Sequence, residues 1–481
     1  MGWKEKSTMY AKVMLGLLGL AVLGFPVLAE TVSIAPDRML SAGKKRVFVL
    51  GLYENPGDDA VLQQVAEAGF NLVQAKADAA ALDRLEQHGL YAWINTGAAI
   101  DFSEDQAKRQ GQLEALAGSS GSHPALLAWE VPDEALWNCW YGATRWRTDQ
   151  EPKQQDLKFE ELDDAALVRQ LKADQAEVRR LWNRGDYVAA EDLANAIWRK
   201  MDMEPPNPDL RVSKSAEKAA KMCAGMLEGY AFLKRTDPGH PIWMNHAPRN
   251  MQAQLAAFNN AADIVGCDIY PVTEYQCGHS GLADRSLSTV GAHTTYMQDA
   301  APGKPVWMVL QGFAWPDIEE KPTAESREKN KRPTFDESRF MAYDAIVRGA
   351  RGLLYWGTAY IEKDSELWKD LLKLVRELAD LQPVLAAPDA ALSVSVSLAE
   401  TWGTCDRGVQ VLAKDVDGKI WLIVVNESPD CLYYTLNGLA GLDGMVYSDP
   451  KDKRESRVAD SKMSLAIEGH GVQVLEPSSE K

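Results

Sequence analysis

The stretch that decides the fold is Ala125-Leu-Leu-Ala-Trp-Glu-Val-Pro-Asp-Glu134, an apolar run that ends in carboxylates. A short, continuous apolar run predicts a strand of a buried parallel sheet. The carboxyl ends of such strands are where α/β enzymes carry their reactive groups. Three acids, Glu130, Asp133 and Glu134, therefore lie where chemistry is expected, and Trp129 places an indole beside them.

Eight strand-like runs alternate with helical patterns between residue 46 and about residue 385. Eight βα units are the number that closes a (β/α)8 TIM barrel of parallel strands. A doubly wound open sheet is the alternative, but residues 51–56, which follow the first run, lack a glycine-rich phosphate turn. The expected strands are 47–53, 70–75, 91–95, 126–130, 242–246, 264–270, 306–311 and 353–357.

Helical connectors fit between these runs. Residues 58–68 have apolar side chains at helical spacing and stop at Gly69, and residues 79–87 show the same spacing. Residues 335–348 form a third such pattern, for which Thr334 is the expected N-cap.

The connection between Glu134 and Pro241 is far longer than a plain βα loop. It contains helical patterns at 163–182, 187–200 and 213–234. We expect the last helix to join the outer ring and residues of about 147–212 to form a helical insertion after the fourth strand. The insertion is either a cap over the catalytic face or a solvated decoration, and the sequence leaves both open.

After residue 385 the pattern changes to short alternating runs separated by Asp-Gly and Asn-Gly turns. The runs include 392–398, 409–412 and 420–425. They predict an antiparallel β-sandwich over residues 386–481, behind a catalytic barrel over residues 30–385. The sandwich is expected to be structural, and sugar binding through Trp402 or Tyr433 is the alternative.

The composition limits the possible partners. At 481 residues the chain is long enough for a barrel and an accessory domain. Its hydrophobic content of 46% and charged content of 25% are those of a globular protein. The formal charge of −17, without a basic stripe, argues against a nucleic acid or an anionic membrane as partner. A neutral or cationic substrate fits this balance better.

Residues 1–29 resemble a secretory signal peptide. Lys4, Lys6 and Lys12 precede an apolar stretch over residues 13–28, which is shorter than the roughly 20 residues of a membrane span. We expect cleavage after this segment, a secreted or periplasmic protein and no membrane contact afterwards. An uncleaved anchor is the alternative.

Export permits disulfides, and the chain has six cysteines. Proximity along the chain favours the pairs Cys267–Cys277 and Cys405–Cys431, which leaves Cys139 with Cys223, and a partly free set of thiols is the alternative. Metal binding is the rival interpretation, but no CxxC or HxxxH spacing supports it. We expect neither a metal nor a cofactor.

Because strand ends of a parallel barrel meet at one mouth, side chains from distant positions converge there. The expected mouth has acids, amides and aromatic rings, but no Cys–His pair and no Gly-x-Ser-x-Gly elbow. Glycoside hydrolysis needs two carboxyl groups, one of them protonated near neutral pH because an apolar wall raises its pKa. Carbohydrate recognition is expected from Glu54, Asn95, Trp129, Asp133, Asn245, His246, Tyr270, Gln311 and Trp356.

Three strings are similar to those of bacterial glycoside hydrolases with a TIM barrel. They are His123-Pro-Ala-Leu-Leu-Ala-Trp-Glu-Val-Pro-Asp-Glu134, Asp268-Ile-Tyr-Pro271 and Lys304-Pro-Val-Trp-Met-Val-Leu-Gln-Gly-Phe313. The resemblance is to the large clan A, which places its acid/base on a Glu after the fourth strand, and it covers roughly residues 46–385. It implies that Glu134 is the acid/base and that Asp133 stands where the clan usually has Asn.

The chain departs from the clan at the end of the seventh strand. The clan has its nucleophilic Glu there, whereas this chain has Gln311, and an amide cannot act as a carboxylate nucleophile. Asp268 is the best substitute, and Glu54, Glu274 and Glu362 follow. An inverting or substrate-assisted route fits a missing nucleophile better than a double displacement.

The sequence therefore predicts a secreted glycoside hydrolase that cleaves O-glycosidic bonds of an oligo- or polysaccharide. Glu134 is the expected proton donor and Asp268 the expected base or second acid. A catalytically inactive carbohydrate-binding barrel is the alternative, and a surface assembly protein that uses the helical insertion is a further one. The sugar, its linkage and the oligomeric state stay open.

Overall fold

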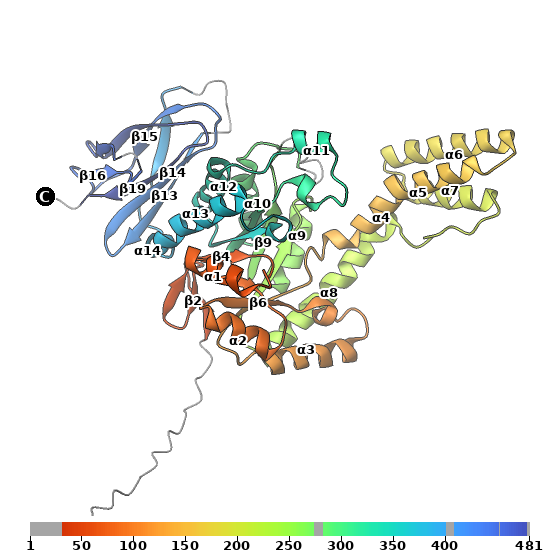
Figure 1. Cartoon of the computed structure of the whole chain (residues 1–481), viewed down its shortest axis with the longest axis horizontal. Helices are drawn as coiled ribbons and strands as arrows, with labels where there is room; N and C mark the ends of the chain where they lie inside the picture. Colours follow the sequence, from red (N-terminus) through yellow and green to blue (C-terminus); the bar gives the residue numbers. More distant parts are fainter. Residues whose placement is uncertain (1–30, 274–281, 401–407, 452, 479–481) are drawn as a thin grey trace, which may run out of the picture.

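The computed structural model describes residues 31–273, 282–400, 408–451 and 453–478. Eight parallel strands form a closed barrel in the order β4-β5-β6-β7-β8-β9-β10-β11 (Figure 1). The predicted TIM barrel is therefore confirmed. Its strands are β4 (Val49–Leu52), β5 (Leu72–Gln74), β6 (Tyr91–Asn95), β7 (Leu126–Glu130), β8 (Ile242–His246), β9 (Ile264–Ile269), β10 (Val306–Gln311) and β11 (Gly352–Trp356).

Helices surround the barrel and begin and end where the sequence provides caps. Helix α1 starts behind Asp58, whose side chain accepts from the Val61 amide, and it ends at Gly69 with a φ of 98°. Helix α12 starts with a capping box between Thr334 and Glu337. The ring consists of α1 (Asp59–Ala68), α2 (Ala79–Gln87), α3 (Gln106–Ser120), α8 (Ser215–Thr236), α9 (Gln252–Phe258), α10 (Thr289–Ala300), α12 (Phe335–Val347) and α13 (Glu366–Asp380).

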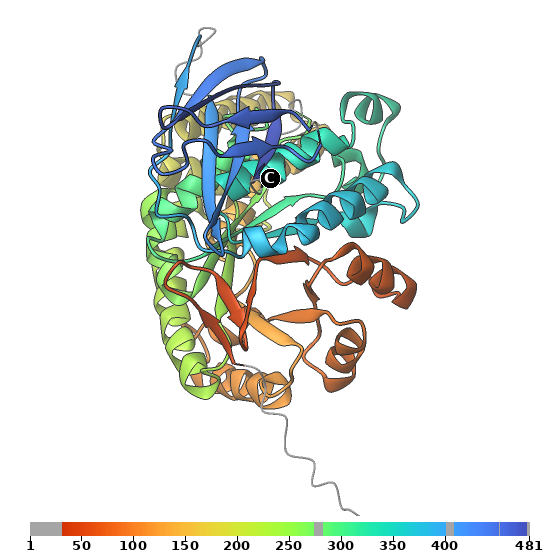
Figure 2. The same cartoon turned by 90° about the vertical axis from the view of Figure 1, so that its left-hand side faces the viewer.

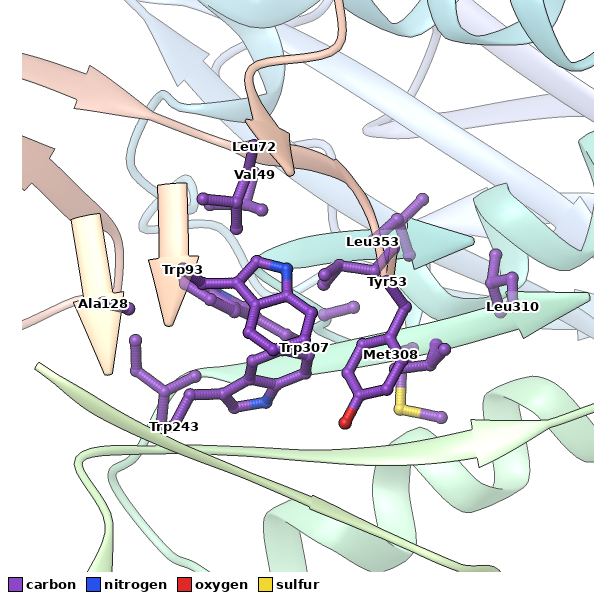
Figure 3. Close-up of a cluster of buried hydrophobic side chains, with 14 of the residues drawn as sticks. Val49, Tyr53, Leu72, Trp93, Ala128, Trp243, Trp307, Met308, Leu310 and Leu353 are labelled. Atoms are coloured by element: carbon purple, nitrogen blue, oxygen red, sulfur yellow. The ribbon is translucent and has the colours of Figure 1, made fainter. Parts of the chain in front are cut away.

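Large aromatic side chains fill the barrel interior (Figure 3). The ring centroids of Trp93 and Trp243 lie 5.7 Å apart, and those of Trp243 and Trp307 lie 5.4 Å apart. Tyr53 stacks on Trp93 at 4.9 Å. Glycine makes room here, since a Cβ at Gly266 would lie 2.9 Å from the indole nitrogen of Trp243 and 2.2 Å from the backbone oxygen of Trp307. This aromatic layer is rigid, well-packed support for side chains at the strand ends.

A three-stranded antiparallel sheet precedes the barrel and was not predicted. It consists of β1 (Val32–Ile34), β2 (Leu40–Ala42) and β3 (Lys45–Val47). The expected first strand is thus split between β3 and β4. The amide of Val32 donates to the carbonyl of Gly239, which precedes β8, over 3.0 Å. The sheet therefore lies at the amino-terminal end of the barrel strands, opposite their carboxyl ends.

The predicted helical insertion after the fourth strand is present as an arm that extends away from the barrel (Figure 1). The arm has a small core of its own that includes Phe159, Leu171 and Trp198. A buried ion pair fixes its base, with Arg147 Nη1 2.8 Å from a carboxylate oxygen of Glu151. Its elements are α4 (Tyr141–Arg145), a π-helical turn (Trp146–Gln150), α5 (Glu151–Glu160), α6 (Ala165–Asn183) and α7 (Tyr187–Lys200).

Two antiparallel sheets form the C-terminal part, as predicted for a β-sandwich (Figure 2). One sheet has the order β12-β15-β18 and the other β13-β14-β19-β16-β17. Arg348, which follows α12, binds Glu427 of the sandwich at 2.6 Å. The strands are β12 (Ser395–Leu398), β13 (Val409–Val416), β14 (Lys419–Asn426), β15 (Leu432–Asn437), β16 (Val446–Ser448), β17 (Glu455–Arg457), β18 (Lys462–Ile467) and β19 (Val472–Pro477).

The cysteine prediction needs a correction. Cys139 and Cys223, which were expected to form a disulfide, both carry free thiols. The thiol of Cys139 instead donates to the Ala135 carbonyl at 3.3 Å. The other two expected pairs involve Cys277 and Cys405, which lie outside the described residues.

The expected signal peptide, residues 1–29, also lies outside the described part of the chain. Among the helices that the structure describes, none combines the length and the apolar character that crossing a membrane requires.

Candidate active site

A cavity of about 250 Å³ opens at the carboxyl ends of the barrel strands. Its wall carries three carboxyl groups, those of Asp133, Glu134 and Asp268. Aromatic rings make up most of the remaining wall. They belong to Tyr53, Trp137, Tyr141, Tyr270, Trp315 and Trp356. The cavity thus combines ionisable oxygens with flat apolar surfaces, which is the composition of a sugar-binding site.

The turn after β7 presents Asp133 and Glu134 to the cavity. Glu134 has a φ of 49°, in the left-handed region that residues other than glycine rarely adopt. The Glu134 carbonyl accepts from the amide of Asn138 at 2.9 Å, which holds the turn. Backbone strain of this kind persists where the surrounding structure enforces it and is common at functional sites.

Glu134 has the protonation behaviour of a general acid. Burial, together with the negative charge of Asp133, raises the pKa of Glu134 to about 7. The carboxyl group of Asp268 lies within hydrogen-bonding reach and partly offsets this rise. The proton of Glu134 is therefore available near neutral pH, because a carboxylic acid with an ordinary pKa would have lost it.

Asp268, near the end of β9, is held by a shared amide. The Asn245 side chain donates to Asp268 and also to Asp133 Oδ1, the latter at 3.1 Å. Burial and the charges of Glu134 and Asp133 raise the pKa of Asp268 well above its ordinary value. Asn245 thus fixes two of the three carboxyl groups relative to each other.

Glu130, which the sequence left open as acid or structural group, lies beneath the cavity. It is fully buried, accepts from Tyr53 Oη, and accepts from Asn95 Nδ2 at 2.6 Å. Burial, followed by the charge of Asp133, raises its pKa well above the usual range. Glu130 and Asn95 are thus bound to each other, and Glu130 holds Tyr53 of the cavity wall, but neither is among the described residues that line the cavity.

Two predicted binding residues, Trp129 and His246, have side chains that point away from the cavity because side chains alternate along a strand. The indole nitrogen of Trp129 donates to Asp237 at 2.8 Å. The His246 ring bonds the Asn259 side chain at 2.9 Å, and burial lowers its pKa to about 4. Neighbouring residues on a strand face opposite sides, so Trp129 and His246 point outward where Glu130 and Asn245 point inward.

Gln311 and Glu54 lie near the mouth but are not among the described residues that line the cavity. The Gln311 amide is bound to backbone: it accepts from the Val272 amide at 2.9 Å and donates to the Phe313 carbonyl at 3.0 Å. Glu54 accepts from the hydroxyl of Thr358. Gln311 thereby secures the segment that follows Tyr270.

The remaining substitutes for the missing nucleophile lie elsewhere. Glu362 is exposed and binds Arg332 at 2.8 Å. Glu274 lies outside the described residues. Within the described part of the chain, Asp268 is thus the substitute that shares the cavity with Glu134.

The aromatic wall is ordered by ring packing. Tyr270 and Trp356 stack with centroids 5.5 Å apart, and Phe313 packs edge-on against Trp356 at 5.0 Å. On the opposite side Trp137 stacks on Tyr141 at 4.8 Å. Trp137 therefore faces the cavity and also packs against α4 at the base of the arm.

Sequence reasoning missed Tyr53 and Tyr141 as cavity residues. Tyr53 follows the first barrel strand, so the rule that strand ends converge could have identified it. Tyr141 lies in the long insertion, for which no sequence signal gives a position relative to the barrel. Near the same wall, the guanidinium of Arg249 lies 5.3 Å from the Trp137 ring centre.

One group of side chains within the described residues has the spacing of a metal site. Asp83, Glu86 and His123 bring ligand atoms within 4.8 Å of one another. His123 precedes β7, so this group is at the opposite end of the barrel strands from the cavity.

Comparisons with known proteins support the fold. No protein-family model matches the chain, and a search of curated proteins finds no match. A glycoside hydrolase family 5 structure from Bacteroides vulgatus aligns over 93% of both chains, with 13% identity and a TM-score of 0.52. Gan42B, a GH42 beta-galactosidase from G. stearothermophilus, aligns over 89% of this chain and 98% of its own, with 11% identity and a TM-score of 0.50. The predicted resemblance to TIM-barrel glycoside hydrolases is thus confirmed at the level of the fold, with no family assigned.

Proposed function

We propose that the protein is a glycoside hydrolase that cleaves an O-glycosidic bond of an oligo- or polysaccharide. The observation that carries the proposal is that Glu134 and Asp268 line the same aromatic-walled cavity. Two facing carboxyl groups with different roles are what glycoside hydrolysis requires. The two fold neighbours named above are glycoside hydrolases, which agrees with this chemistry.

Glu134 is the proposed proton donor. Its pKa of about 7 keeps the proton available for the oxygen that leaves the sugar. After departure the same group, now ionised, accepts a proton from the attacking water. The apolar wall supports this role because it disfavours the charged form of the acid before the reaction.

Asp268 is the proposed nucleophile. Carboxyl groups about 5 Å apart act with retention, whereas inverting enzymes hold them roughly 6.5–9.5 Å apart to admit a water. Glu134 and Asp268 lie close enough for Asp268 to lower the pKa of Glu134 through a hydrogen bond, which is nearer to the retaining spacing than to the inverting one. The geometry therefore favours retention over the inverting route that the amide at Gln311 suggested.

The aromatic wall provides the binding surface. Trp356 and Trp137 face the cavity from different barrel loops, and indole faces cover the apolar faces of sugar rings. The proposal includes residues 1–29 as an export signal that is cleaved off. The mature enzyme would then act on its polysaccharide outside the cell or in the periplasm.

The direct test is a polysaccharide screen with the mature protein and a Glu134→Gln variant. Wild type should release reducing ends, and the variant should lose roughly 10²–10⁴-fold in rate while it still binds the glycan. Glu114→Gln, on the exposed face of α3, is the matched control and should keep full activity. Equal, negligible turnover by wild type and Glu134→Gln, with binding intact, would favour the carbohydrate-binding alternative.

A further inference from the structure

The cavity carries more acid than hydrolysis needs. Two carboxyl groups are sufficient for the chemistry, and Glu134 and Asp268 provide them. Asp133 is a third, and it lines the same cavity. No Lys or Arg is among the described residues of the wall. A neutral sugar would leave this third carboxylate without a countercharge, which is costly once the bound sugar displaces water from the cavity.

Asp133 retains acceptor capacity for a ligand. An ionised carboxylate has about four lone-pair sites. The Asn245 amide occupies one of them at 3.1 Å, and Tyr53 lies within hydrogen-bonding reach of the group. Asp133 is exposed in the cavity, so its remaining sites are open to an incoming donor.

A neighbouring acceptor lacks a donor. The side-chain oxygen of Asn245 is fully buried and accepts no hydrogen bond from any residue that the structure describes. Buried oxygens without a donor are rare and are concentrated at functional sites. The amide nitrogen of the same side chain binds both Asp133 and Asp268.

The aromatic rings complete the recognition of a cation. Trp137, Tyr141, Tyr270, Trp315 and Trp356 surround the acids. Ring faces of Trp and Tyr attract an ammonium group within about 6 Å of the ring centre. Carboxylates inside such a wall therefore select for a group that carries positive charge and only donors.

We propose that the sugar bound beside Glu134 carries a protonated amino group, and that the Asp133 carboxylate binds that ammonium. This inference rests on the proposed function and names its substrate class: a glycan of amino sugars with free amines. N-acetylation removes the charge and two of the three donors, so the acetylated sugar is a poor match. The net charge of −17 favours the approach of such a cationic polymer.

The test is binding of monosaccharide probes to the intact protein, measured by calorimetry or ligand-observed NMR. The probes are D-glucosamine and D-galactosamine, their N-acetyl derivatives, and D-glucose and D-galactose. An amino sugar should bind about tenfold or more tightly than its neutral and acetylated counterparts, as expected for a charge-assisted hydrogen bond. The advantage should shrink at about 0.5 M salt, because screening weakens the ion pair.

Asp133→Asn separates charge from shape. The variant should lose the preference for amino sugars and keep its affinity for neutral ones. Asp58→Asn is the control, since Asn also caps α1 and the residue lies outside the cavity, and it should keep the preference. If Asp133→Asn melts at a clearly lower temperature than wild type, the variant is set aside. The inference is then tested by whether salt reduces the amino-sugar preference of wild type.

Several results overturn the inference: no binding of either amino sugar, equal or tighter binding of the acetylated or neutral forms, or an undiminished preference in Asp133→Asn. The proposed function fails separately. Glu134-dependent hydrolysis of a neutral glycan would overturn the inference and leave hydrolysis standing. Binding of amino sugars through Asp133 without hydrolysis of any glycan would support amine recognition and overturn the proposed hydrolase function.

Discussion

The pH dependence of hydrolysis is the most informative prediction, because it reports the proton on Glu134. The acid is active when protonated, and its pKa of about 7 places the loss of that proton at neutral pH. The protonated fraction falls from about 0.9 at pH 6 to about 0.1 at pH 8. We therefore expect kcat/KM to fall about tenfold between these values, and tenfold more for each further pH unit.

The cause of the raised pKa gives a second perturbation. The negative charge of Asp133 contributes to the rise at Glu134, after burial. Removing that charge with Asp133→Asn should move the descending limb of the profile to lower pH, while burial keeps it above the ordinary value for Glu. Asp58→Asn changes charge outside the cavity and should leave the limb where it is.

The assay is initial rates of reducing-end release on whichever glycan the screen identifies, from pH 4 to pH 10, with stability checked at each pH. Rates that stay flat from pH 6 to pH 9, with chemistry rate-limiting, would refute the assignment of Glu134 as the acid. A limb that moves to higher pH in Asp133→Asn would refute the electrostatic explanation.

Three further predictions concern the nucleophile, the core and the N-terminus. Asp268→Asn should lower kcat by roughly three orders of magnitude or more without loss of folding, measured by reducing-end assay and circular dichroism. Gly266→Ala should destabilise the protein by about 1–3 kcal/mol in a thermal melt, because the new Cβ would meet the Trp307 backbone at 2.2 Å. Gly111→Ala in α3 meets nothing within 4 Å and should be neutral or stabilising. N-terminal sequencing of the protein from its native host should begin near residue 30, and a sequence that begins at Met1 would contradict export by cleavage.

Much of the fold could be predicted because its signals are local. The run at β7 and the cap of α12 by Thr334 are set by residues within a few positions of each other, and both lie where the sequence places them. The N-terminal sheet could not be predicted in this way. Strands of three residues carry too little pattern, and β1 depends on a contact with Gly239 about 200 positions away.

The candidate site was predictable in part. The strand-end rule placed Glu134 and Asp268 at one mouth, and both line the cavity. The rule does not say which of two neighbouring residues points inward, which is why His246 was grouped with Asn245. That choice depends on strand register in the closed barrel, which no single strand specifies. The backbone role of Gln311 depends on the segment after β9, a tertiary contact without a sequence signal.

The central claim is that Glu134 and Asp268 act as acid and nucleophile on the same sugar. It is tested most directly by mass spectrometry of Glu134→Gln treated with a glycoside whose leaving group departs without protonation. The account predicts an added glycosyl mass on the peptide that contains Asp268, because the variant forms the ester but hydrolyses it slowly. An unmodified protein that releases product of inverted configuration, or a sugar attached to any other residue, would contradict it.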